Sequence, residues 1–269
     1  MKVVYRGFSL KISDENIRRL TNYQQNYFNS STIRDTLRRN IVASYSIDAD
    51  ELKSDWFPTI KSDVFLSHSH KDIELAKKIA YLLGTLHLET FIDSEVWGYS
   101  DDLVKQIEEQ YYPYGAFQVH DKIVAHVNIM LASALTKMLN NTECVIFLNT
   151  PNSIAPAGYS NSSKTDSPWI YHELFTTSIL PVNAPIRKSH HRPGTVVNEA
   201  NQPHILHTPP LDHLTDLDDS DFSSWINGAR SSNYHSLDVL YELKPLRLNN
   251  VIPTSVKKIR LSGPILYWK

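Results

Sequence analysis

The sequence predicts an α/β fold in which a central parallel sheet is covered by helices on both faces. Three short apolar runs, at 64–66, 88–93 and 143–149, have the length and content of buried strands. Each run is followed by a segment whose apolar residues recur at helical spacing. Strand and helix in alternation are typical of a parallel sheet with right-handed crossovers.

Composition and charge narrow the class of protein. The 269 residues are 41% hydrophobic and 21% charged, as in ordinary globular proteins. A formal net charge of -2 argues against general binding to nucleic acid or to an anionic membrane. No glycine-rich phosphate loop is present. The one cysteine, Cys144, lies in an apolar run and is expected to be a buried thiol in a reducing compartment.

Three regions are expected along the chain. Residues 1–60 are predicted to be an accessory segment with a strand at 2–10, a helix after Ser13, another helix at 32–41 and a polar linker at 48–57. Residues 61–245 form the α/β domain, and 246–269 form a tail with a possible edge strand. No signal-like or membrane-spanning stretch is expected, which favours a cytoplasmic protein.

The chain is organised around the first buried strand, at 64–66. A polar turn, Ser67 to Lys71, follows this strand, and a helix is predicted from Asp72 to Leu83. In an open α/β sheet, ligands bind in the crevice beyond the carboxyl ends of the strands. This turn is therefore the first candidate for a binding site.

The later elements follow from local signals. A polar loop is predicted at 94–100, and Ser167 with Pro168 is a typical helix start. The remaining predicted elements are helices at 101–110, 121–139, 168–179, 216–225 and 236–243, and a fourth strand at 204–209.

At 63–69 the chain resembles the first strand and turn of a Toll/interleukin-1 receptor (TIR) domain. Residues 91–93 are similar to the second strand of that family, and 94–102 to the loop that borders its ligand cleft. Trp169 and Glu173 match the WxxxE motif that follows the third strand. The resemblance covers about 63–180 and extends to about 243, and it implies a flavodoxin-like fold with N- and C-terminal extensions.

Two features depart from the family pattern. The segment between the second and third strands is longer than usual, because a break at 111–116 and a long helix replace one short helix. Some NAD-cleaving members carry arginines in the first turn, where this chain has Ser69 and His70. The contact with the phosphates would therefore differ.

The resemblance implies cleavage of the nicotinamide–ribose bond of NAD⁺, with Glu173 as the catalytic carboxylate. The products would be nicotinamide and ADP-ribose or a cyclic ADP-ribose-type signal, in bacterial antiphage immunity. NAD⁺ would be the substrate and no further cofactor is expected. Self-assembly through TIR–TIR contacts and a downstream effector that senses the product are the expected partners.

Seven further residues are candidates for substrate binding. Ser67, His68, Ser69 and His70 lie at the strand end, where they could donate to a diphosphate or could satisfy local backbone groups. The others are Asp93 for a ribose hydroxyl, Trp97 for stacking or closure of the cleft, and Trp169 for the nicotinamide or the pocket wall. Asp93 could instead cap the loop.

Two alternative functions stay open at this point. Many relatives are scaffolds that signal by homotypic contacts without catalysis. A metal-dependent hydrolase is the second alternative, because His68 and His70 follow a strand and acidic residues lie elsewhere in the chain.

Overall fold

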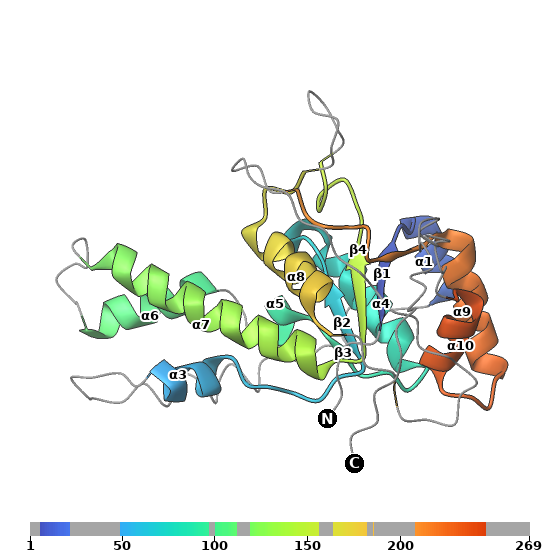
Figure 1. Ribbon diagram of the computed structural model, residues 1–269, viewed down its shortest axis with the longest axis horizontal. Coiled ribbons are helices and arrows are strands. Elements are labelled where there is room, and N and C mark those ends of the chain that lie inside the picture. The colour runs from blue at the N-terminus through green and yellow to red at the C-terminus, as the bar shows by residue number, and fades with distance from the viewer. Residues whose placement is uncertain are drawn as a thin grey trace, which may run out of the picture.

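The computed structural model describes residues 6–21, 49–96, 100–111, 119–155, 164–181, 185 and 208–245. Within these residues, five strands form one parallel sheet in the order β3-β2-β4-β1-β5 (Figure 1). The strands are β1 Arg6–Leu10, β2 Val64–Ser67, β3 Thr90–Phe91, β4 Cys144–Leu148 and β5 Thr215–Leu217. The predicted α/β fold with a flavodoxin-like sheet is confirmed.

The N-terminal strand lies inside the sheet. β1 pairs with β4 over its whole length, from Arg6↔Cys144 to Leu10↔Leu148, and with β5 on its other edge. A flavodoxin-like sheet has the strand order 2-1-3-4-5, in which the strands are numbered along the chain. If β2 is counted as strand 1, then β3, β4 and β5 are strands 2, 3 and 5 of that order. The N-terminal strand β1 takes the place of strand 4. Residues 1–60 are therefore not wholly an accessory segment, because 6–10 complete the core of the sheet.

Side chains that alternate along the strands divide the core between two faces. Cys144, Ile146 and Leu148 of β4 point to one face, and Val145 and Phe147 point to the other. The first face is covered by four helices: α1 Asp14–Leu20, α4 Ile73–Gly84, α9 Asp219–Ser231 and α10 Ser236–Leu243. The second face is covered by α7 His120–Asn141 and α8 Pro168–Ile179.

An arm of three helices extends away from the sheet (Figure 1). It consists of α3 Ala49–Trp56, α6 Ser100–Tyr111 and the far half of α7. The prediction of a polar linker at 48–57 was wrong, because Leu52, Trp56 and Phe57 are buried in one cluster with α6 and α7. The sequence around α3 reads as polar because only one narrow side of the helix is apolar.

Helix α7 has 22 residues and is about 33 Å long. By length and composition alone it is apolar enough to cross a membrane, so the expectation that no stretch would qualify was wrong. In this fold the helix packs on the second face of the sheet, through residues such as Val127, Leu135 and Met138. Only 44% of its most apolar window is buried.

The predicted helix starts at Ser13 and Ser167 are confirmed by their capping bonds. The Ser13 hydroxyl accepts a hydrogen bond from the Asn16 amide at 3.2 Å, and Ser167 accepts one from Ile170 at the same distance. The helix predicted from 216 begins later, at Asp219, because β5 occupies Thr215–Leu217. The region predicted as a loop at 94–100 includes a short helix, α5 Asp93–Val96.

Several predicted elements lie outside the described residues. These are the helix at 32–41, the break at 112–116, most of the strand at 204–209 and the tail at 246–269. Thr208 and Pro209, the described part of that strand, are not in a strand.

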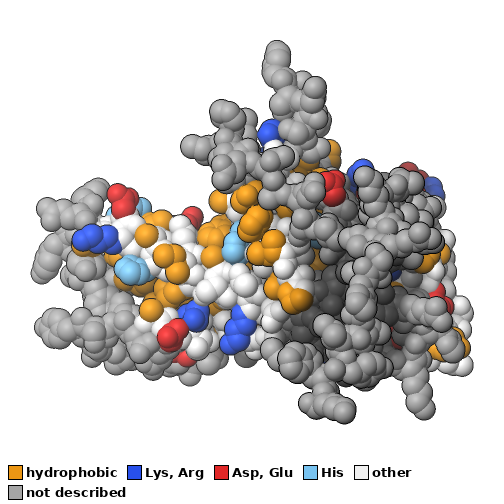
Figure 2. All heavy atoms as spheres, in the orientation of Figure 1, with side chains coloured by type: hydrophobic (Ala, Val, Ile, Leu, Met, Phe, Trp, Pro, Cys, Tyr) orange, Lys and Arg blue, Asp and Glu red, His pale blue; other side chains and the backbone are white. Residues whose placement is uncertain are grey.

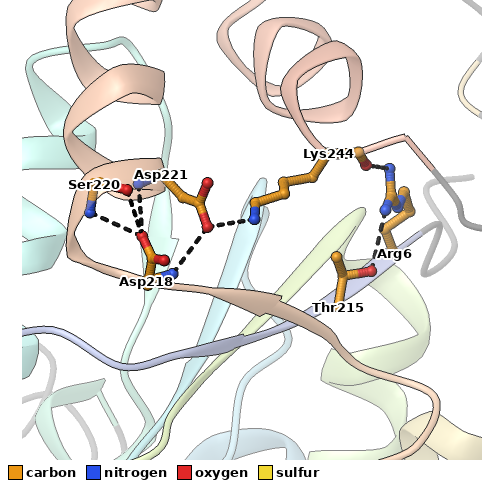
Figure 3. A network of polar contacts seen from close by, with 6 residues as sticks. All are labelled: Arg6, Thr215, Asp218, Ser220, Asp221 and Lys244. Atoms are coloured by element: carbon orange, nitrogen blue, oxygen red, sulfur yellow. Dashed lines mark hydrogen bonds and ion pairs between the residues drawn. The ribbon is translucent and has the colours of Figure 1, made fainter.

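A polar network joins β1 and β5 to the C-terminal helices (Figure 3). The buried guanidinium of Arg6 donates to the Lys244 carbonyl at 2.5 Å and to the Thr215 hydroxyl at 3.1 Å. The Lys244 ammonium pairs with Asp221, whose carboxylate also accepts from the backbone amide of the helix cap Asp218. These contacts fix the late helices against the N-terminal strand.

Candidate active site at the carboxyl ends of β2 and β4

The sheet has a topological switch point between β2 and β4. The chain runs outward from β2 to β3 through α4, which covers the first face, and returns to β4 through α7, which covers the second. Parallel sheets of this kind bind ligands at such a point, beyond the carboxyl ends of the strands. The polar residues that follow β2 and β4 meet there.

Ser67 and Glu173 are in direct contact at this point. Val64 and Leu66 point to the first face, so Ser67, next to Leu66, points to the second face, where α8 lies. Its hydroxyl donates a hydrogen bond of 2.6 Å to Oε2 of Glu173. Both side chains are buried, with exposures of 1% and 4%. Two residues predicted for the site from distant motifs are thus brought together.

The electrostatic environment of Glu173 is unusual for a helical glutamate. Burial raises its pKa well above the usual range, and the negative charge of Asp93 raises it further. The hydrogen bond from Ser67 opposes these effects, because it stabilises the charged form. Among the described residues, no Lys or Arg contributes to this balance. A carboxyl whose pKa is raised by burial and by a second carboxyl at the end of a parallel sheet is a candidate functional group.

Asp93 reaches the site because of the sheet order. It follows the edge strand β3, whose residues Thr90 and Phe91 pair with Val64 and Phe65 of β2. It begins the short helix α5 and is half-buried. Two carboxyl groups therefore act on one another across the end of β2.

His68 is held from both sides by the protein. Its Nδ1 lies 3.2 Å from the Leu66 carbonyl, which requires a proton on that nitrogen. Its Nε2 is then the acceptor for the Ser94 hydroxyl at 3.3 Å. With both ring nitrogens engaged and an exposure of 8%, His68 positions the start of α5 beside Asp93. The bond to the Leu66 carbonyl is the local backbone contact that the sequence offered as the alternative to a substrate contact.

Asp72 connects the turn after β2 to the loop after β4. Its carboxylate accepts 2.5 Å and 2.7 Å hydrogen bonds from Thr150 Oγ1 and Asn152 Nδ2. The sequence suggested a helix-dipole role for Asp72 and a place among the ligands of the metal-dependent alternative, and it did not single out Thr150 or Asn152. The available signal was two polar residues directly after a buried strand, at the same edge of the sheet as Ser67.

The other predicted residues lie around this centre. Ser69 caps the 3₁₀ turn at His70–Asp72 and accepts from the Lys71 amide at 3.4 Å, and His70 is exposed. Trp169 is half-buried against the apolar cluster that includes α7. Trp97 lies outside the described residues.

The described residues offer little for a metal. No group of three or more His, Cys, Asp or Glu side chains among them is arranged to hold an ion. His68 has both nitrogens engaged, and His70 is exposed in the next turn. The described part of the chain therefore gives no support to the metal-dependent alternative.

A separate cavity of about 200 Å³ lies in the arm. The described residues that line it are apolar except for one histidine: Ala49, Leu52, Ile107, Ile123, His126 and Met130. None of these side chains is a carboxylate, and none of the residues predicted for the site lines this cavity.

Comparison of this chain with protein families, with curated proteins and with solved structures finds no match. The resemblance to TIR domains therefore stays a prediction that depends on the motifs and on the geometry described above.

Proposed function

We propose that this chain cleaves the nicotinamide–ribose bond of NAD⁺ and that Glu173 is the catalytic carboxylate. The observation that carries the proposal is the buried carboxyl of Glu173 at the switch point, hydrogen-bonded by Ser67 and close to Asp93. The site lies where α/β sheets bind their ligands and contains the residue that the TIR-like motif singles out.

The chemistry matches what such a carboxyl can do. When the bond between C1′ and the pyridinium nitrogen breaks, its electron pair goes to the ring, and neutral nicotinamide leaves. The ribose becomes oxocarbenium-like, and an ionised Glu173 stabilises that positive charge. A water oxygen then bonds to C1′ and gives its proton to the carboxylate, which yields ADP-ribose. Attack by an adenine nitrogen instead yields a cyclic product.

The raised pKa of Glu173 fits a substrate whose reacting ring is a cation. Without substrate, burial and Asp93 favour the protonated form. A pyridinium cation at the site favours the charged form, so NAD⁺ binding would release a proton. The dihydronicotinamide ring of NADH is uncharged, so binding of NADH would leave the proton in place.

The wider role follows from the resemblance. In this proposal the product is a nucleotide signal, or NAD⁺ is depleted, in cytoplasmic antiphage immunity. Copies of the chain assemble, and a downstream effector senses the product.

The test is nicotinamide release from NAD⁺, measured by chromatography under conditions that promote assembly. We expect release by the wild type and at least about 100-fold less by Glu173→Gln, because the substituted amide cannot carry the negative charge. Undiminished release by a folded Glu173→Gln variant would rule out the mechanism. No release by an assembled wild type would favour the scaffold alternative.

A further inference from the structure

Helix α8, which carries Glu173, lies at the surface of the molecule. Its outer side is exposed at Phe175 (45%) and Ile179 (60%), and Figure 2 shows hydrophobic side chains gathered over this helix. The described contacts of α8 lie beneath it, on the sheet, and along its two flanks. The position of the Glu173 carboxyl depends on these contacts.

A histidine bonds α8 to its neighbour on each flank. On the side of α7, His172 Nε2 donates to the Ala132 carbonyl at 3.1 Å. On the side of β5, His213 Nε2 lies 2.9 Å from Thr177 Oγ1. His213 belongs to the segment 208–214, which precedes the edge strand β5. Its bond therefore links α8 to that edge of the sheet.

The proton that joins His213 to Thr177 comes from the imidazole. The Thr177 hydroxyl donates its one proton to the Leu174 carbonyl at 2.9 Å, so its oxygen is the acceptor for the His213 Nε2–H. Nδ1 of His213 then carries the lone pair, and this buried nitrogen has no hydrogen-bond partner in the described part of the chain. Burial lowers the pKa of His213 to about 4, against the opposing charge of Asp212, so the ring is neutral at pH 7.

The bond from His213 acts on the part of α8 that carries the site. Thr177 lies one helical turn after Glu173, on the same buried side of the helix, so a bond that fixes one also limits rotation at the other. The Ser67–Glu173 bond measures 2.6 Å, and a hydroxyl–oxygen bond extends to about 3.0 Å. A carboxylate about 6 Å from the helix axis crosses this margin of about 0.4 Å when the helix turns by roughly 4°.

We propose that His213 is a positioning residue that, through Thr177, holds Glu173 in place to accept the hydrogen bond of Ser67. Its bearing on catalysis rests on the proposed function, whereas the positioning itself is measurable without NAD⁺. The alternative is that His213 only fills space beside Leu211, which packs on the apolar cluster under α8. In that case the loss of His213 and the loss of the Ser67 hydroxyl would be independent.

A double-mutant cycle, measured by urea unfolding of the full chain, separates the two. In the wild type, Ser67→Ala should lower the folding equilibrium constant by roughly 5- to 150-fold, because a buried acceptor is left unpaired. In a His213→Leu background, where α8 has lost one anchor, the same substitution should lower it by less than about threefold. His213→Gln keeps an N–H donor for Thr177 and should restore the wild-type loss.

Ser62→Ala is the matched control. Ser62 is 2% exposed and its hydroxyl lies 3.1 Å from Thr142 Oγ1, but it precedes the amino end of β2, at the opposite end of the strand from Ser67. The loss caused by Ser62→Ala should agree within about twofold between the wild type and His213→Leu.

Thr177→Val is the second variant for this bond, because it deletes the acceptor and keeps the shape of the side chain. Circular dichroism shows that each variant is folded. Equal Ser67→Ala losses in the wild type and in the His213→Leu or Thr177→Val background would overturn the proposal. It would also be overturned if His213→Gln restored nothing, or if Ser62→Ala lost its effect in the same way. Nicotinamide is not measured, so failure here is distinct from failure of NAD⁺ cleavage.

Discussion

Ser67→Ala separates the electrostatic role of Ser67 from its structural role. The substitution deletes a 2.6 Å hydrogen bond to a carboxyl that is only 4% exposed. An acceptor left unsatisfied in a buried site costs about 1–3 kcal/mol of unfolding free energy. The same bond lowers the pKa of Glu173, so its loss raises that pKa further.

The assay is the pH dependence of nicotinamide release at limiting NAD⁺. If the ionised form of Glu173 is the active one, the rate rises with pH through the pKa of that group. The rising limb of the Ser67→Ala profile should therefore lie at higher pH than that of the wild type. Denaturant unfolding on the same samples gives the stability change.

Ser9→Ala is the matched control for this prediction. Ser9 on β1 and Ser67 on β2 both pair with Phe147, on opposite sides of β4. Ser9 is also buried, but its hydroxyl accepts a 2.9 Å bond from Asn149 rather than contacting Glu173. We expect Ser9→Ala to lower stability without moving the rising limb. An unmoved limb in Ser67→Ala, or equal shifts in both variants, would refute the reasoning.

Three further predictions concern stability. Burial raises the pKa of Glu173 in the folded chain, so the folded chain keeps this proton to higher pH than the unfolded chain does. The free energy of unfolding should therefore fall as pH rises above the pKa of Glu173 in the unfolded chain. Glu173→Gln should remove that decline and be more stable than the wild type at neutral pH, as measured by urea titration. Asp72→Ala removes the carboxylate that accepts hydrogen bonds from Thr150 and Asn152. It should lower the free energy of unfolding by about 2–4 kcal/mol in the same urea titration. A loss under 0.5 kcal/mol, about the scatter of surface substitutions, would show that the two bonds matter little. Burial lowers the pKa of His213 to about 4. The stability that neutral His213 contributes is therefore complete above its unfolded-state pKa near 6.5 and is lost as pH falls toward 4. A His213→Gln variant should lose less stability over that interval, and thermal melts at the two ends of the range measure the difference.

Local patterns predicted the elements that carry the site. The apolar runs of β2 and β4 and the cap at Ser167 depend on neighbours in sequence, and each is found where the pattern indicates. The sequence also predicted Glu173, Ser67 and Asp93 as members of one site. Ser67 and Asp93 lie near one another because the carboxyl ends of the adjacent strands β2 and β3 lie at one edge of the sheet, and helix α8 brings Glu173 to the same place.

What the sequence did not reveal depends on long-range contacts. β1 has the pattern of any short strand, and only its pairing with residues near 144 shows that it lies inside the sheet. Helix α3 appears polar until α6 and α7 cover Leu52 and Trp56. A glutamate in a helix reads as solvated, so neither the burial of Glu173 nor its hydrogen bond could be inferred from composition. The role of Asp72 depends on loop residues that lie 78 and 80 positions further along the chain.

The most direct test of the central claim compares two buried glutamates. Glu143 is also 4% exposed and accepts a 3.0 Å bond from the Tyr241 hydroxyl, but it lies before the amino end of β4, away from the site. Nicotinamide release should fall at least about 100-fold in Glu173→Gln and stay within about threefold of wild type in Glu143→Gln. Equal rates in the two folded variants would contradict the assignment of Glu173 as the catalytic group.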